Sequence, residues 1–151
     1  MKIVAVTSDY HQKVFDLIKN FSDQYVMLPK SIDEIINLAE SFRILVNENS
    51  DVIACAMLDQ FTDELAEVKS LAVDKAYQGH GYGRLLVSDC EAAARALGIK
   101  RLFALTYEEK FFHKLGFQTV SMETLPEKVY RECVRCHYFN NCKEIAVVKN
   151  L

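Results

Sequence analysis

The 151-residue chain is 50% hydrophobic, which is enough to bury the core of one compact domain over residues 1–151 and too short for two. It carries 18 Lys and Arg against 21 Asp and Glu, and the resulting net charge of −3 excludes the basic surface that a nucleic-acid partner requires. No apolar run approaches the ~18 residues of a membrane span, so we expect no membrane partner either. An odd count of 5 cysteines in a chain without a secretion signal favours reduced thiols and a cytoplasmic location.

The N-terminal half predicts a strand, two helices and three further strands. Residues 2–6 read as the first strand, and Ser8 or Asp9 is expected to cap the helix that follows. Ser31 and Glu34 form an S-x-x-E capping box ahead of a second helix. Apolar runs separated by polar turns then predict three strands of one sheet, the first two as an antiparallel hairpin, at 42–46, 52–58 and roughly 64–73.

The C-terminal half predicts strands that alternate with helices. A glycine-bearing loop at 74–83 leads into an amphipathic helix at 84–97, and Gly98 stands just past the helix end, where glycine is favoured. A strand, a short helix and a strand follow at 101–106, 111–115 and 117–120, and a last strand is expected at 145–148. The expected class is therefore α/β, a mixed α+β arrangement around one sheet.

The loop before the long helix contains the motif Gln78-x-x-Gly81-x-Gly83. Glycines let a backbone approach a ligand closely, and successive N–H groups at a helix N-terminus bind anions such as a diphosphate. The spacing matches neither the P-loop nor the dinucleotide-binding motif. A plain tight turn is the alternative reading, and the strand and helix on either side favour the anion site.

Three segments together resemble the GNAT acetyltransferase superfamily, namely Leu71-Ala-Val73, Gln78-Gly-His-Gly-Tyr-Gly83 and Phe112-His-Lys-Leu-Gly-Phe117. Further segments are similar to the acetyltransferase domain of bacterial N-acetylglutamate synthases, among them Ile53-Ala-Cys-Ala56, Ala66-Glu-Val-Lys-Ser-Leu-Ala-Val73 and Leu125-Pro-Glu-Lys128. The resemblance implies the GNAT-type acyl-CoA N-acyltransferase fold, a central, mostly antiparallel sheet flanked by helices. It also implies direct transfer of the acetyl group of acetyl-CoA to the α-amino group of L-glutamate, the first step of arginine biosynthesis.

The same resemblance assigns the residues that hold acetyl-CoA. The strand edge pairs with pantetheine, and one of its amides polarises the acetyl carbonyl; the residues concerned are Leu71, Ala72 and Val73. Backbone N–H groups of the loop and the first helical turn hold the diphosphate, at Gln78, Gly79, His80, Gly81, Tyr82, Gly83 and Arg84. The ring of His80 matters less in this role than its backbone.

Glu67 is the candidate general base for the attacking amine. If the third strand of the series is regular, Glu67, Lys69, Leu71 and Val73 face one side, which brings a carboxylate and an ammonium beside the acetyl site. An exposed ion pair between Glu67 and Lys69 is the alternative reading. A bulge, common in this superfamily at that strand, would upset the alternation.

Glutamate brings two carboxylates, so the acceptor site needs cations. Lys30 and Lys69 are the candidates, and Cys55 matches a family position beside the acceptor. The alternative for Cys55 is small apolar filling of a buried strand. The absence of arginines that relatives carry near the acceptor leaves another amino acid or a small amine open as the acceptor.

The general acid is open as well, because Phe112 stands where many relatives place a tyrosine. Tyr107 is a possible substitute, against the alternative that it is a packed aromatic. A thiolate whose conjugate acid has a pKa of ~8.5 needs little help in leaving. A non-catalytic CoA-binding regulatory module therefore stays open as a third function.

A cysteine cluster lies near the C-terminus, at Cys133, Cys136 and Cys142, with His137 beside it. Four soft ligands suit tetrahedral zinc in principle, but Cys136 and His137 are adjacent in the chain and a second C-x-x-C pair is absent. Reduced thiols are the favoured reading, so no metal is expected. The resemblance to the superfamily implies a homodimer.

Overall fold

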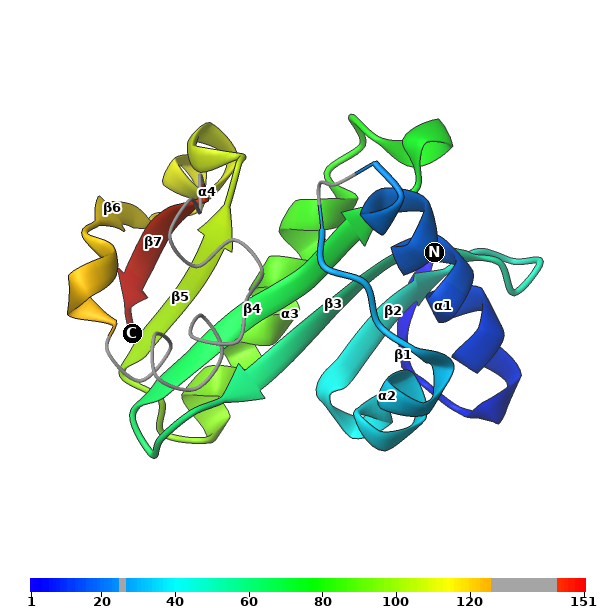
Figure 1. Ribbon diagram of the computed structural model, residues 1–151, viewed down its shortest axis with the longest axis horizontal. Coiled ribbons are helices and arrows are strands. Elements are labelled where there is room, and N and C mark those ends of the chain that lie inside the picture. Colours follow the sequence, from blue (N-terminus) through cyan, green and yellow to red (C-terminus); the bar gives the residue numbers. More distant parts are fainter. Residues whose placement is uncertain (25–26, 126–143) are drawn as a thin grey trace. The chain divides into compact units, whose positions relative to one another are not determined.

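A computed structural model describes residues 1–24, 27–125 and 144–151 (Figure 1). It divides into two compact units, Met1–Asp59 with Val68–Ala93, and Gln60–Glu67 with Ala94–Leu151. The single domain expected over 1–151 stays a prediction. No helix among the described residues combines the length and the apolar character that a membrane span requires.

Within the described residues, seven strands form one mixed sheet in the order β1-β2-β3-β4-β5-β7-β6. The pairs β1–β2, β2–β3, β5–β7 and β6–β7 run antiparallel, whereas β4 and β5 are parallel. The strands are β1 Lys2–Ala5, β2 Phe42–Val46, β3 Val52–Gln60, β4 Leu65–Val73, β5 Arg101–Thr106, β6 Gln118–Val120 and β7 Ile145–Asn150. A mostly antiparallel sheet flanked by helices is the predicted fold class, and it is confirmed.

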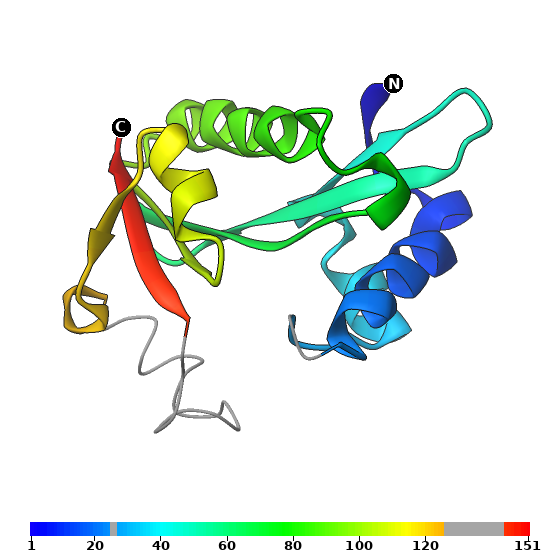
Figure 2. The same ribbon diagram turned by 90° about the horizontal axis from the view of Figure 1, so that it is seen from above.

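In the first unit, helices cover both faces of the strands. Figure 2 shows α3 on one face and α1 and α2 on the other. The helices are α1 His11–Ser22, α2 Ile32–Asn37 and α3 Tyr82–Ala96. The last residues of α3, from Ala94 on, belong to the second unit. The core beneath α1 is fully apolar: Val14 and Ile18 have no exposed surface and pack with Ile44, Cys55 and Met57 of the strands.

Local signals explain where the helices of the first unit begin and end. The Ser31 side chain accepts a hydrogen bond from the Glu34 N–H, and the Ser31 N–H donates to Glu34 Oε1, both at 3.1 Å. The predicted capping box is therefore confirmed. The predicted cap of α1 is wrong: Ser8 belongs to a short 3-10 turn, Ser8–Tyr10, and Tyr10 precedes the helix without a side-chain cap.

The second unit packs α4, Glu109–Lys114, beside the strands β6 and β7. Its core contains Leu65, Phe103 and Leu125, and the Phe61 ring meets Phe103 edge-on at 5.6 Å. The last strand, β7, pairs with both β5 and β6 and so separates these two strands. A pairing between strands so far apart in the chain leaves no trace in local periodicity.

Candidate active site

The glycine loop joins the end of β4 to the start of α3, and hydrogen bonds to the ends of β3 and β4 and within the loop hold its first half. The Asp74 N–H donates to the Ile53 carbonyl at 2.8 Å, and the Asp74 side chain caps a 3-10 turn over Lys75–Tyr77. Gln78 Nε2 donates to the Val73 carbonyl at 3.0 Å. The Gln78 side chain thus ties the loop to the end of β4.

The second half of the loop has open space beside its glycine backbone. Gly79 and Gly81 have φ of +86° and +81°, a conformation that glycine adopts without strain, and nothing lies within 4 Å of the position that a Cβ would occupy at either residue. The Gly81 carbonyl accepts from Leu85 N–H, which starts α3 directly after this glycine. The N–H groups of Tyr82, Gly83 and Arg84 have no carbonyl within the helix to bond, and the helix dipole favours an anion beside them.

β4 changes its side-chain alternation at Ser70, which has φ of +55°. Lys69 forms an ion pair with Asp59. Asp59 lies on the same face of β3 as Cys55 and Met57, because these three positions are two residues apart along the strand. Ala72 joins the core cluster that contains those two residues. Lys69 and Ala72 thus share a face although they are three residues apart, so the predicted common face of Glu67, Lys69, Leu71 and Val73 is wrong beyond Lys69.

Cys55 lies directly beneath this irregularity and has no exposed surface. Its thiol donates to the Ser70 carbonyl at 3.3 Å and receives a hydrogen bond from the Ala72 backbone. Burial raises the pKa of the Cys55 thiol to about 12, although the Ala72 hydrogen bond opposes this. The thiol therefore supports the backbone of β4, and its place beside the acceptor stays a prediction.

Stability should fall at alkaline pH because two buried thiols resist ionisation. Burial also raises the pKa of Cys90, to about 11, against an ordinary value of 9.0 for both thiols. Below pH 9 the thiols are protonated in both states; above it the unfolded chain ionises first, so the free energy of unfolding falls by up to ~1.4 kcal/mol per pH unit for each thiol. Urea unfolding between pH 8 and pH 11 measures this slope.

Alanine variants separate the thiols from other groups that titrate at high pH. Cys55→Ala and Cys90→Ala should each flatten the decline in stability above pH 9. The cavity left by each change lowers stability equally at every pH, so it does not alter the slope. A slope identical to that of the unmodified protein in both variants would contradict the expectation.

Glu67 is buried, with 2% of its surface exposed. The parallel ladder between β4 and β5 runs from Leu65 paired with Arg101 to Glu67 paired with Phe103. Glu67 therefore stands where this ladder ends and β4 continues toward Val73. The exposed setting of the alternative ion pair between Glu67 and Lys69 is wrong, because Glu67 is buried; Lys69 Nζ lies 2.8 Å from Asp59 Oδ2.

The acceptor candidates lie on the first unit. Lys30 is half-buried in the segment between α1 and α2, which lies on the same side of the strands as those helices (Figures 1 and 2). Lys69 lies on the face of β4 that α1 and α2 cover, as its partner Asp59 shows. Sequence reasoning missed Asp59, although an acidic residue two positions after the buried Met57 was a visible signal.

Two aromatic residues bear on the general acid. Phe112 is 4% exposed and packs edge-on against Phe111 and Phe117, each at 5.1 Å, so it is a core residue of the second unit. Tyr107 is 54% exposed, which shows that the packed-aromatic reading is wrong. The hydroxyl of Tyr107 therefore stays a candidate for proton donation, whereas Phe112 has no proton to give.

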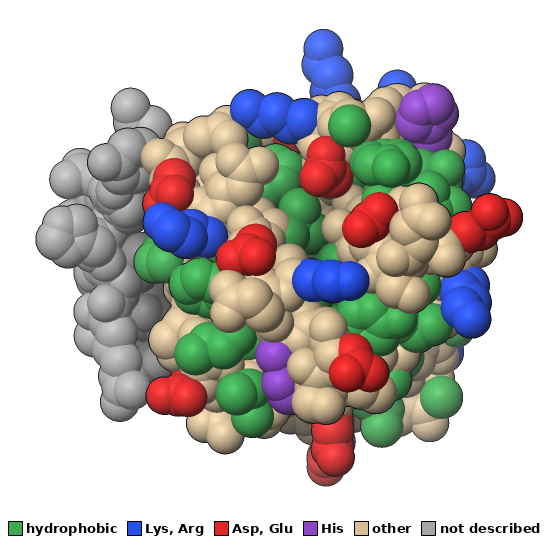
Figure 3. Space-filling view, turned by 90° about the vertical axis from the view of Figure 1, so that its right-hand side faces the viewer, with side chains coloured by type: hydrophobic (Ala, Val, Ile, Leu, Met, Phe, Trp, Pro, Cys, Tyr) green, Lys and Arg blue, Asp and Glu red, His purple; other side chains and the backbone are tan. Residues whose placement is uncertain are grey.

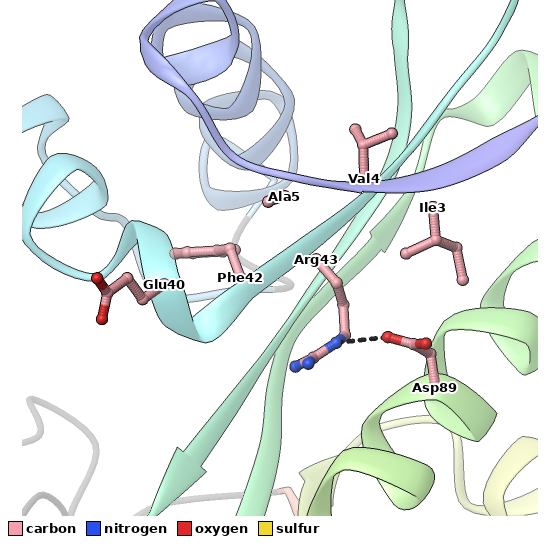
Figure 4. Close-up of a pocket in the computed structure, with 7 residues that line it drawn as sticks. All are labelled: Ile3, Val4, Ala5, Glu40, Phe42, Arg43 and Asp89. Atoms are coloured by element: carbon pink, nitrogen blue, oxygen red, sulfur yellow. Dashed lines mark hydrogen bonds and ion pairs between the residues drawn. The ribbon is translucent and has the colours of Figure 1, made fainter.

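A shallow cavity of about 260 Å³ lies elsewhere on the first unit (Figure 4). Arg43 Nε donates to Asp89 Oδ2 at 2.7 Å across it and so links β2 to α3. None of the predicted site residues lines this cavity; its lining is Ile3, Val4, Ala5, Glu40, Phe42, Arg43 and Asp89. The Arg43 ion pair is accordingly a link between a helix and the sheet.

The surface charges are mixed. On the face of the described residues that Figure 3 shows, basic and acidic side chains are interspersed, in keeping with the net charge of −3. Among the described ranges no group of three His, Cys, Asp or Glu side chains is arranged to hold a metal ion. Cys133, Cys136, His137 and Cys142 lie outside the described residues.

The sequence matches known acetyltransferases over most of its length. The profile of the Acetyltransferase (GNAT) family matches residues 9–117. An uncharacterized N-acetyltransferase of Chlorobaculum tepidum is 33% identical over 135 residues, 89% of this chain and 86% of that protein. An amino-acid acetyltransferase of Mycobacterium tuberculosis is 29% identical over 125 residues, 80% of this chain and 72% of that protein.

A solved structure extends the similarity to the fold. The N-acetylglutamate synthase of Neisseria gonorrhoeae, complexed with coenzyme A and N-acetyl-glutamate, matches with a TM-score of 0.86 and 29% identity. The match covers 99% of this chain and 35% of the Neisseria chain. The mixed sheet and the glycine loop that opens α3 are those of the acyl-CoA N-acyltransferase fold. The chain belongs to the GNAT acetyltransferase family, and acetyl-CoA is its acetyl donor.

Proposed function

We propose that this protein acetylates the α-amino group of L-glutamate, the reaction that forms N-acetylglutamate at the start of arginine biosynthesis. The Mycobacterium relative, an amino-acid acetyltransferase, supports an amino acid as acceptor. The N-acetyl-glutamate bound by the Neisseria synthase supports glutamate. The single observation that carries the chemistry is the buried Glu67 carboxylate at the end of the β4–β5 ladder.

Acetyl-CoA supplies an acetyl group activated as a thioester. The backbone of the glycine loop and the first turn of α3 would hold its diphosphate, through the residues from Gln78 to Arg84. β4 beyond Glu67 leaves the ladder with β5, so its backbone groups from Leu71 to Val73 would pair with pantetheine and polarise the acetyl carbonyl. Main-chain groups thus perform most of the donor binding.

The amine of the acceptor must lose a proton in order to attack. Glu67 would take this proton directly or through a water, a role for which a carboxylate shielded from solvent is suited. Lys69, on the face of β4 that α1 and α2 cover, and Lys30, in the segment that joins these two helices, would bind the two carboxylates of glutamate. Holding both partners in place lowers the entropic barrier to direct transfer.

An acceptor panel tests the proposal. The purified protein is given acetyl-CoA and each of the common amino acids, and released CoA is measured by chromatography, which avoids interference from the protein's own thiols. We expect glutamate to give the highest kcat/KM. A different preferred amino acid would overturn glutamate as the acceptor, and tight CoA binding without any release would favour a regulatory module.

A further inference from the structure

The strands that carry the acceptor candidates hold an ion pair that is largely withdrawn from solvent. Lys69 Nζ lies 2.8 Å from Asp59 Oδ2, and the exposed fractions of the two side chains are 18% and 13%. Asp59 continues the β3 face on which Cys55 and Met57 are core residues. Asp and Lys side chains rarely reach such burial, and when they do they are paired.

Stability alone does not explain this pair. The desolvation of both charges offsets their attraction, so an apolar pair of similar volume is often equally stable. Its position suggests a use, because Lys69 is a proposed acceptor cation and follows the proposed base, Glu67, by two residues of β4. Any acceptor carboxylate that reaches Lys69 meets an ammonium already facing Asp59.

We propose that Asp59 sets the acceptor specificity by reducing the positive charge that Lys69 presents to a carboxylate. The inference rests on the proposed transfer of acetyl groups to amino acids. An ammonium has three donors, so it can bind an acceptor carboxylate together with Asp59. The two carboxylates then lie on the order of 5–6 Å apart through one nitrogen, and their repulsion weakens acceptor binding roughly tenfold.

This arrangement has a consequence for the substrate range. Asp59 reduces the affinity that an acceptor carboxylate gains from Lys69. An amino acid with a neutral amide in place of that carboxylate therefore binds almost as tightly. The protein should therefore use a carboxamide analogue of glutamate only a few times less well than glutamate. Without the Asp59 charge, the site should discriminate strongly in favour of the carboxylate.

The test compares Asp59→Asn with the unmodified protein on three acceptors: glutamate, its γ-amide glutamine and its α-amide isoglutamine. In Asp59→Asn we expect KM to fall roughly tenfold for glutamate and for whichever amide keeps the carboxylate at Lys69, while KM for the other amide and all kcat values change little. The ratio of KM values does not depend on the folded fraction of a preparation. Asp59→Ser provides a second variant that removes the same charge.

Two further variants control the result. Asp63→Asn removes an exposed acid from the turn between β3 and β4 and should leave all three KM values unchanged. In a Lys69→Gln background the acceptor carboxylate has no ammonium to bind, so KM should rise for glutamate and for the amide that keeps this carboxylate, while KM for the other amide changes little.

The outcomes separate this inference from the proposed function. Turnover by the unmodified protein with KM ratios that are the same in Asp59→Asn and Asp59→Ser would overturn the role of Asp59 alone. An equal change of KM for all three acceptors would do the same, because it is not specific to a charge. No turnover with any amino acid by the unmodified protein would overturn the proposed function and this inference together.

Discussion

Replacement of Glu67 by glutamine is expected to lower kcat for acetyl transfer about 100- to 10,000-fold, the range that a positioned general base contributes. Glutamine keeps the size of the side chain but cannot accept the proton of the attacking amine. The KM for the acceptor and the Kd for CoA should change little, because Glu67 is assigned to neither. Steady-state CoA release and a CoA titration measure these quantities.

The pH dependence sharpens this prediction. As pH rises, a larger fraction of the acceptor amine is already deprotonated, so the deficit of Glu67→Gln should shrink. Glu64→Gln is a matched control, since Glu64 lies three residues earlier, is 65% exposed and pairs with Lys100 at 3.3 Å. A kcat reduced equally by both substitutions, or a deficit in Glu67→Gln that is constant with pH, would remove Glu67 as the base.

The glycine loop was the part of the site most accessible to sequence reasoning. Glycines before an amphipathic helix predict an anion-binding turn, and the positive φ of Gly79 and Gly81 agrees with that expectation. The helix itself begins two residues earlier than predicted, at Tyr82. Apolar periodicity marks the buried face of a helix, and the first turn of α3 is partly or fully exposed, so its start left no apolar signal.

The features that periodicity could not supply involve contacts between distant segments. Ser70 adopts a left-handed conformation inside β4. A serine within an apolar run does not predict this conformation. Its support comes from Cys55 on the neighbouring strand. Likewise, Lys69 was expected either to bind the acceptor or to pair with Glu67, and its observed partner Asp59 lies on another strand. Strand register decides these pairs, and register is a property of the whole sheet.

Exposure was predicted less well at residues that end a helix or strand. The helical spacing of apolar residues over 84–97 includes Leu85 and Leu97, yet these two residues are 45% and 53% exposed. Leu85 lies in the first turn of α3, and Leu97 follows its last residue, Ala96. Periodicity identifies the side of a helix that can be buried, but not how much of each end the rest of the protein covers.

Alanine at both Gly79 and Gly81 is expected to weaken CoA binding about 30- to 1,000-fold. A Cβ would meet nothing within 4 Å at either residue, so the effect does not come from a clash. It comes from the backbone, because a left-handed conformation costs a residue with a Cβ roughly 1–2 kcal/mol. The loop of the variant should relax away from φ of +86° and +81°. Restoring the N–H positions when CoA binds then reduces the free energy of binding.

Gly98 provides the matched control for this prediction. It follows the end of α3, has φ of +78° and likewise has no atom within 4 Å of a Cβ. Gly98→Ala should therefore lower the free energy of unfolding by a similar ~1–2 kcal/mol per substituted residue while leaving the Kd for CoA unchanged. Calorimetric CoA titration and urea unfolding separate the two effects. An unchanged Kd in the double variant, or an equal loss of affinity in Gly98→Ala, would show that the conformation of these two glycines does not hold the diphosphate.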